Sequence, residues 1–153
     1  MVAMKARAVT VVPGPAADVE ALLYDAQRWA SWVDGFGRVV TLVGAWPDRG
    51  AVLTWESRPG GRGLVRERVT SRTAGEGQVL EVEDERLEGT QSIALVEAGD
   101  RVQVTLELDY RLKERNALTP VVDALFVRRA LNASLQRSLA RFSRERAADA
   151  ELH

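Results

Sequence analysis

The feature that most constrains this chain is a series of strand-like stretches, with very short connections, between residues 38 and 112. The stretches cover residues 38–46, 51–57, 63–72, 78–85, 90–97 and 101–112, and every connection contains Gly. Parallel strands need crossovers of about a dozen residues or more, whereas antiparallel strands can be joined by a tight turn. The spacing therefore predicts an antiparallel meander.

Residues 101–112 show the clearest alternation of apolar and polar side chains in this region. The apolar positions are Val102, Val104, Leu106, Leu108 and Tyr110. Successive side chains of a strand point to opposite faces of the sheet, so this pattern predicts one buried face and one exposed face.

The rest of the chain supplies a cover for the buried face. Residues 4–12 are predicted to form a first strand, residues 15–23 and 28–33 two short helices, and residues 118–146 a long helix. The long helix has an apolar stripe made of Leu118, Val121, Leu125, Leu135, Leu139 and Phe142. We expect the tail after residue 147 to fray. The sequence thus predicts one α+β domain, residues 1–153, with about seven strands.

Charge and rare residue types exclude several classes of function. The chain has 21 basic and 22 acidic residues, and a net charge of -1 argues against a nucleic-acid-binding protein. It has no Cys, and His153 is its only histidine, so serine–histidine triads and sites that bind zinc through Cys or His are not expected. Residues 60–63 (GGRG) join two strands and contain no Lys, which does not fit a phosphate-binding loop. No metal or cofactor is predicted.

No targeting or membrane-spanning segment is recognisable. The apolar run before Pro13 is too short for a signal peptide, and no window approaches the about 20 apolar residues of a membrane helix. A cytoplasmic location is therefore expected.

Three segments carry a resemblance to a known family. Residues 9–13 (VTVVP) with 17–19 (ADV) resemble its opening from strand to helix, and residues 25–32 (DAQRWASW) resemble its second short helix. Residues 125–131 (LFVRRAL), followed by the apolar positions up to Phe142, resemble its C-terminal helix. The chain is similar in this way to the helix-grip fold of the START-like (SRPBCC) superfamily, in its polyketide cyclase/dehydrase and lipid-transport branch.

The resemblance implies a curved antiparallel sheet wrapped around the long C-terminal helix, with a ligand cavity between them. It also implies a hydrophobic ligand such as a lipid, polyketide, sterol or plant hormone, and some members cyclise or dehydrate aromatic polyketides. The branches use different catalytic residues, so the resemblance transfers none to this chain.

Polar residues at predicted buried positions are candidates for the site. Arg128 and Asn132 lie near the centre of the apolar stripe of the long helix, and Glu67 shares a face with Val65 and Val69. A buried charge without a partner is costly, so Arg128 either reaches solvent, pairs with a carboxylate of the sheet or contacts a ligand. Glu67 is a candidate acid or base, or else a structural ion pair, and a register shift by one residue would expose it.

Further candidates come from the buried face of the sheet. The Tyr110 hydroxyl is either a hydrogen-bond donor to a ligand carbonyl or part of the core. Trp55 is a candidate flat wall for an aromatic ligand, and Gln91 offers a second polar contact. Leu106 and Leu108 are expected to line the same cavity. We hypothesise that Glu67, Tyr110, Arg128 and Asn132 converge there.

Two features of the sequence bear on possible partners. The Arg-rich end of the long helix, Arg137, Arg141, Arg144 and Arg146, is interpreted as a solvated face, with a contact to an acyl carrier protein or an anionic membrane surface as the alternative. An exposed edge strand would allow a homodimer. The competing functions are a cyclase or dehydratase, a carrier or sequestering protein for the same ligand, and an interaction module with a collapsed cavity.

Overall fold

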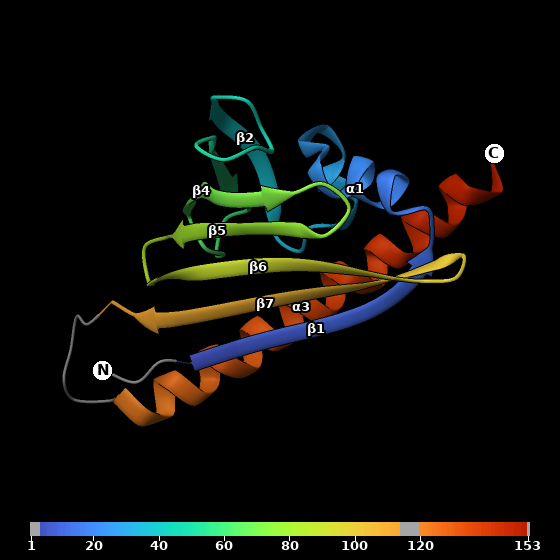
Figure 1. Cartoon of the computed structure of the whole chain (residues 1–153). Coiled ribbons are helices and arrows are strands. Elements are labelled where there is room, and N and C mark those ends of the chain that lie inside the picture. Colours follow the sequence, from blue (N-terminus) through green and yellow to red (C-terminus); the bar gives the residue numbers. More distant parts are fainter. Residues whose placement is uncertain (1–3, 114–119, 153) are drawn as a thin grey trace.

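The computed structural model describes residues 4–113 and 120–152, with only the backbone for residues 120–124. Within these residues one antiparallel sheet has the strand order β1-β7-β6-β5-β4-β3-β2 (Figure 1). The strands are β1 (Met4–Pro13), β2 (Phe36–Val43), β3 (Val52–Ser57), β4 (Leu64–Thr73), β5 (Gly77–Glu83), β6 (Leu87–Ala98) and β7 (Arg101–Leu112). The helices are α1 (Ala16–Tyr24), the short 3-10 turn η1 (Ala26–Arg28), α2 (Trp29–Trp32) and α3 (Pro120–Glu151).

The sheet confirms the predicted meander and its two faces. Strands β2 to β7 follow one another in the sheet, each antiparallel to the next, and β1 pairs with β7. The five alternating apolar residues of β7 are all buried, while Arg101, Gln103 and Asp109 between them are exposed. The predicted α+β helix-grip architecture is therefore confirmed.

The long helix α3 packs mainly along β1, the edge strand of the sheet (Figure 1). Asn132 of α3 accepts a hydrogen bond from the backbone N–H of Arg7 on this edge, at 2.9 Å. Because the helix follows the edge strand, the side of α3 that faces the sheet differs from the side that was predicted. Leu125, expected in the buried stripe, is exposed, and the side chains of Leu118 and Val121 lie outside the described part of the chain.

Two groups of buried apolar residues fill the space between the sheet and the helices. The first contains α1, α2 and the C-terminal half of α3, where Leu139 and Phe142 are buried. The second lies on the inner face of β4, β5 and β7, and includes Val69, Leu80 and Tyr110. Leu135 of α3 packs against both groups. The space between the two groups is therefore bordered by the middle of α3.

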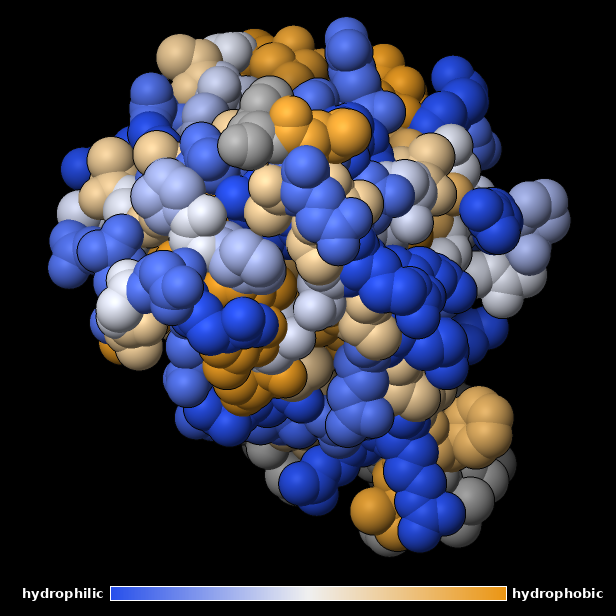
Figure 2. All heavy atoms as spheres, turned by 90° about the vertical axis from the view of Figure 1, so that its right-hand side faces the viewer, coloured by the Kyte–Doolittle hydropathy of each residue, from blue (hydrophilic) through white to orange (hydrophobic). Residues whose placement is uncertain are grey.

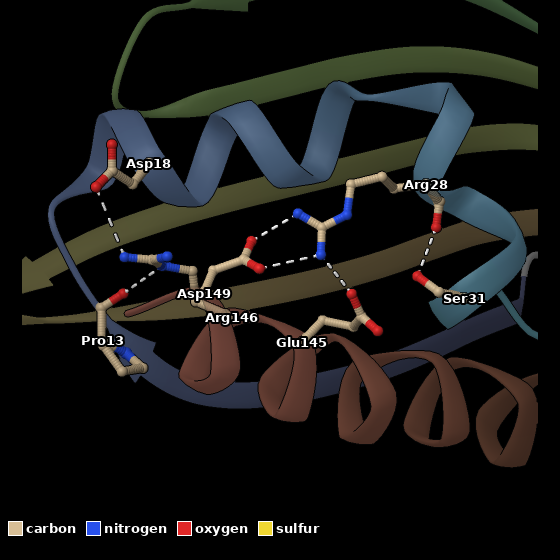
Figure 3. A network of polar contacts seen from close by, with 7 residues as sticks. All are labelled: Pro13, Asp18, Arg28, Ser31, Glu145, Arg146 and Asp149. Carbon is tan, nitrogen blue, oxygen red and sulfur yellow. Dashed lines mark hydrogen bonds and ion pairs between the residues drawn. The ribbon is translucent and has the colours of Figure 1, made fainter. Parts of the chain in front are cut away.

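The C-terminal end of α3 is fixed by the polar contacts of two arginines, Arg28 and Arg146 (Figure 3). Arg28 donates hydrogen bonds to Glu145 and to Asp149, the latter at 2.6 Å. Arg146, which is only 4% exposed, donates to the backbone carbonyls of Pro13 and Gly14 at 3.0 Å. The helix consequently continues to Glu151, beyond residue 147 where the sequence predicted fraying.

This end of the molecule has a largely hydrophilic surface. On the face that holds the C-terminal end of α3, charged and polar side chains dominate, and the hydrophobic ones form separate patches (Figure 2). The interpretation of the Arg-rich end as a solvated face is wrong for Arg146, because its guanidinium is buried against backbone carbonyls.

No helix in the described residues is long and apolar enough to cross a membrane.

Candidate functional site

A small interior pocket lies between the inner face of the sheet and the middle of α3. Its open space is about 80 Å³. Pockets for drug-sized ligands measure roughly 300–1,000 Å³, so this pocket must widen to accept one. All four tryptophans of the chain line it, at positions Trp29, Trp32, Trp46 and Trp55.

Glu67 is the buried carboxyl of this pocket. It lies on β4 between Val65 and Val69, all three side chains are buried, and Glu67 is 6% exposed. Burial penalises the charged form and raises the pKa of Glu67 to about 7. The Arg62 guanidinium and the indole N–H of Trp55 act in the opposite direction, but they do not cancel the cost of burial.

Arg62 reaches the pocket from the connection between β3 and β4. Its Nε donates to the buried Asp84 at 2.7 Å, and its guanidinium carbon lies 5.8 Å from the centre of the Trp55 ring. Asp84 also accepts hydrogen bonds from the backbone N–H groups of Arg86 and Leu87. Arg62 is not predictable from the sequence, because nothing in a Gly-rich connection indicates which way a side chain points.

Two donors around the pocket have no hydrogen-bond partner among the described residues. They are the Trp32 indole N–H and Nη2 of Arg62, both buried atoms. The Trp55 indole N–H faces the Glu67 carboxyl, and the Tyr24 hydroxyl lies beside Arg72 and Glu20. Buried polar groups in proteins are usually hydrogen-bonded, so the unpaired donors need an explanation. A pocket wall of this kind can hold a ligand that brings hydrogen-bond acceptors.

The other predicted site residues divide into two groups. Trp55, Gln91, Leu106 and Leu108 line the same pocket as Glu67. Tyr110 is buried in the second core group, and its hydroxyl has no hydrogen-bond partner among the described side chains. Burial raises the pKa of Tyr110, although the charge of Arg128 acts in the opposite direction.

Two candidate residues of α3 do not line this pocket. Arg128 is exposed, which is one of the alternatives considered for it, and Asn132 binds the β1 edge. Of the four residues expected to converge, Glu67 lines the pocket, whereas Tyr110 lies outside it and within reach of the charge of Arg128.

Asp34 closes the pocket on the side of α3, and it too was missed from the sequence. Its carboxylate accepts hydrogen bonds from Ser134, Arg137 and Arg141, and its backbone N–H donates to Ser138. The hydrogen bond from Arg137 is the main reason why the pKa of Asp34 is lowered. In the sequence, only the spacing of these four partners along one face of α3 pointed to a shared partner. That spacing does not identify Asp34, which lies in the distant connection before β2.

A second, larger hollow of about 660 Å³ lies on the outer face of the sheet. Its charged side chains pair with one another, as Arg68 does with Glu81 and Arg111 with Glu88, and these four residues are well exposed. Such pairs are typical of a solvated sheet face. In the described part of the chain no group of three or more His, Cys, Asp or Glu residues is placed to hold a metal ion.

A curved antiparallel sheet closed by a long C-terminal helix over an interior pocket defines the helix-grip class of proteins. The chain belongs to the polyketide cyclase / dehydrase and lipid transport family, whose model matches residues 3–145. The resemblance to the START-like superfamily is thereby confirmed. No curated protein matches the chain in sequence.

Solved structures share the fold at low sequence identity. The di-domain ARO/CYC StfQ from the steffimycin biosynthetic pathway has a TM-score of 0.78 at 17% identity over 99% of this chain and 52% of that one. This chain thus spans about half the length of StfQ. A START superfamily protein from Mycobacterium smegmatis has a TM-score of 0.74 at 15% identity, covering 95% and 97% of the two chains. Norcoclaurine synthase from Thalictrum flavum has a TM-score of 0.66 at 15% identity, covering 94% and 93%.

Proposed function

We propose that this protein binds a hydrophobic small molecule of aromatic or polyketide type in the interior pocket, and that Glu67 acts on it as an acid or a base. Membership of the family supports a ligand of this class. Two structural neighbours come from such pathways, StfQ from steffimycin biosynthesis and DynU16 from the dynemicin locus.

The observation that carries the proposal is a buried carboxyl group in a pocket lined by tryptophans. With a pKa of about 7, Glu67 can both accept and donate a proton near neutral pH. Loss of water from a β-hydroxy ketone requires this: a base removes the proton next to the carbonyl, and an acid protonates the departing hydroxyl. The apolar walls would hold the ligand beside Glu67, so that proton transfer takes place within one complex.

The pocket has to widen for such a ligand, and the helix offers a place for this. The C-terminal end of α3 is fixed through Arg28 and Arg146, whereas Leu125 and Phe126 near its N-terminal end are exposed. We therefore propose that the wall formed by Leu131 yields when a ligand enters.

Filling the pocket tests the binding proposal. We expect emodin, a trihydroxyanthraquinone, to bind in isothermal titration calorimetry, with palmitate as the comparison for a lipid-type ligand. Leu131→Trp occupies the pocket and should weaken emodin binding at least tenfold, whereas Leu125→Trp makes the same change at an exposed position of the same helix and should have no effect. Equal affinities of the two variants would contradict binding in this pocket.

A carrier without catalytic activity is the second candidate. Glu67 and Tyr110 were the two predicted catalytic residues, and Tyr110 does not line the pocket. A pocket with only one of them favours a carrier. The two functions differ in their effect on 4-hydroxy-4-phenylbutan-2-one, whose dehydration gives a strongly absorbing enone. An enzyme should accelerate the rise in absorbance and lose this ability in Glu67→Gln; binding without acceleration indicates a carrier.

A further inference from the structure

Three polar groups meet on the β3–β4 side of the interior pocket. The Trp55 and Glu67 side chains point inward from neighbouring strands, where Trp55 pairs with Val65, two residues before Glu67. Such diagonal neighbours are within reach of long side chains. Arg62 lies over the Trp55 ring, and its charge acts on Glu67. We call Trp55, Arg62 and Glu67 the polar corner.

Two hydrogen-bond donors of the polar corner are buried and little used by the fold. Nη2 of Arg62 has no partner among the described residues, and the indole N–H of Trp55 faces only the Glu67 carboxyl, without a well-formed hydrogen bond. The guanidinium cannot easily turn away, because its Nε is held by Asp84, which in turn accepts two backbone N–H bonds. A fixed pair of donors of this kind is already arranged for an acceptor and loses little entropy on binding one.

We propose that the polar corner binds the carboxylate of a hydrophobic ligand, an inference that rests on the proposed function and narrows its ligand class. A carboxylate has two oxygens that accept hydrogen bonds, and charge-assisted bonds from a guanidinium are among the strongest in proteins. A protonated Glu67 adds a third donor. An amine would meet the positive charge of Arg62 instead.

Binding of an anion here is coupled to the protonation of Glu67. The charged or titratable residues that line the pocket around it are Arg62 from the β3–β4 connection, Tyr24 from α1 and Asp34 before β2, and Asp84 lies behind Arg62. A ligand carboxylate beside Glu67 favours its neutral form. Affinity for the anion should therefore fall about tenfold between pH 6 and pH 8, as Glu67 loses its proton in the free protein.

A pair of ligands with the same apolar body tests the inference. We would measure binding of anthraquinone-2-carboxylate and anthraquinone-2-carboxamide to the full chain by calorimetry at pH 6 and pH 8. The carboxylate should bind at least tenfold more tightly than the amide at pH 6, and this preference should shrink at pH 8. Equal binding of the two overturns the carboxylate inference and leaves the proposed function intact, whereas no binding of either overturns both.

Matched variants locate the effect in the polar corner. Trp55→Phe removes the N–H donor and keeps an aromatic ring, so it should reduce the preference for the carboxylate several-fold. Arg62→Gln removes the guanidinium of the polar corner and should reduce the preference at least as much, whereas Arg66→Gln removes a guanidinium from an exposed position of β4 and should not change it. An equal loss in Arg62→Gln and Arg66→Gln, or none in Trp55→Phe, would also overturn the inference. Circular dichroism of each variant confirms that it is folded.

Discussion

Replacing Glu67 by Gln should stabilise the protein at pH 8 and leave its stability nearly unchanged at pH 4. Gln has almost the same shape as a protonated Glu but cannot ionise. In the wild type, Glu67 is 6% exposed, so at high pH folding must either bury a charge or keep a proton that the unfolded chain has released.

The magnitude follows from the pKa of Glu67 in the two states. The pKa of Glu67 has its ordinary value of 4.5 in the unfolded chain and rises to about 7 in the folded protein. At 1.36 kcal/mol per pKa unit, this difference corresponds to about 3 kcal/mol. A raised pKa stabilises the fold below pH 4.5, and this contribution is lost as the pH rises towards 7. The gain of Glu67→Gln over the wild type should therefore grow from near zero at pH 4 to about 3 kcal/mol at pH 8.

Urea denaturation at pH 4, 5, 6, 7 and 8 measures this difference as the change in the free energy of unfolding. Glu81→Gln on the outer face of the neighbouring strand β5 is the matched control, because the Glu81 side chain is 57% exposed. It should change the stability by less than about 0.5 kcal/mol at every pH. A difference between Glu67→Gln and the wild type that does not vary with pH would refute the reasoning, since Glu67 would then titrate in the folded protein as it does in the unfolded chain.

Two further predictions concern α3. Phe142→Ala should lower the free energy of unfolding by about 3–5 kcal/mol, because Phe142 is fully buried, whereas Phe126→Ala on the same helix removes a side chain that is 73% exposed and should cost less than about 0.5 kcal/mol; similar losses in urea denaturation would contradict the packing of α3. Asn132→Ala should lower the free energy of unfolding by at most about 1 kcal/mol, because water can replace the amide oxygen at the exposed N–H of Arg7. The backbone N–H of Arg7 should then exchange its hydrogen faster, and unchanged exchange would contradict that contact.

The alternation in β7 and the short connections were sufficient to predict the sheet, because a period of two and a tight turn leave little choice of topology. The placement of α3 was not accessible in the same way. Periodicity tells which residues of a helix share a face, but not which face meets the protein. Arg128 and Asn132 were therefore placed toward a cavity, although α3 follows the edge strand and turns Arg128 to solvent.

The site was predictable where it lies on strands and unpredictable where it lies on connections. Glu67, Trp55 and Gln91 were found from their phase with buried neighbours, which strand geometry converts into a direction. Arg62 and Asp34 follow no such period, and their positions depend on partners far away in the sequence, Asp84 for one and Arg137 with Ser134 for the other.

Arg146, which fixes the C-terminal end of α3, and Leu131, which forms part of the pocket wall, belong to one continuous helix. From Arg146 to Leu131 the helix measures roughly 22 Å at 1.5 Å per residue. Because the helix is rigid, a slight change in its direction at Arg28 or Arg146 displaces Leu131 sideways by a larger amount, within the limit set by the neighbouring Asn132, which is hydrogen-bonded to β1. Substitutions at Arg28 or Arg146 can thus alter how tightly a ligand is held without touching it, and natural variation there would tune affinity from a distance.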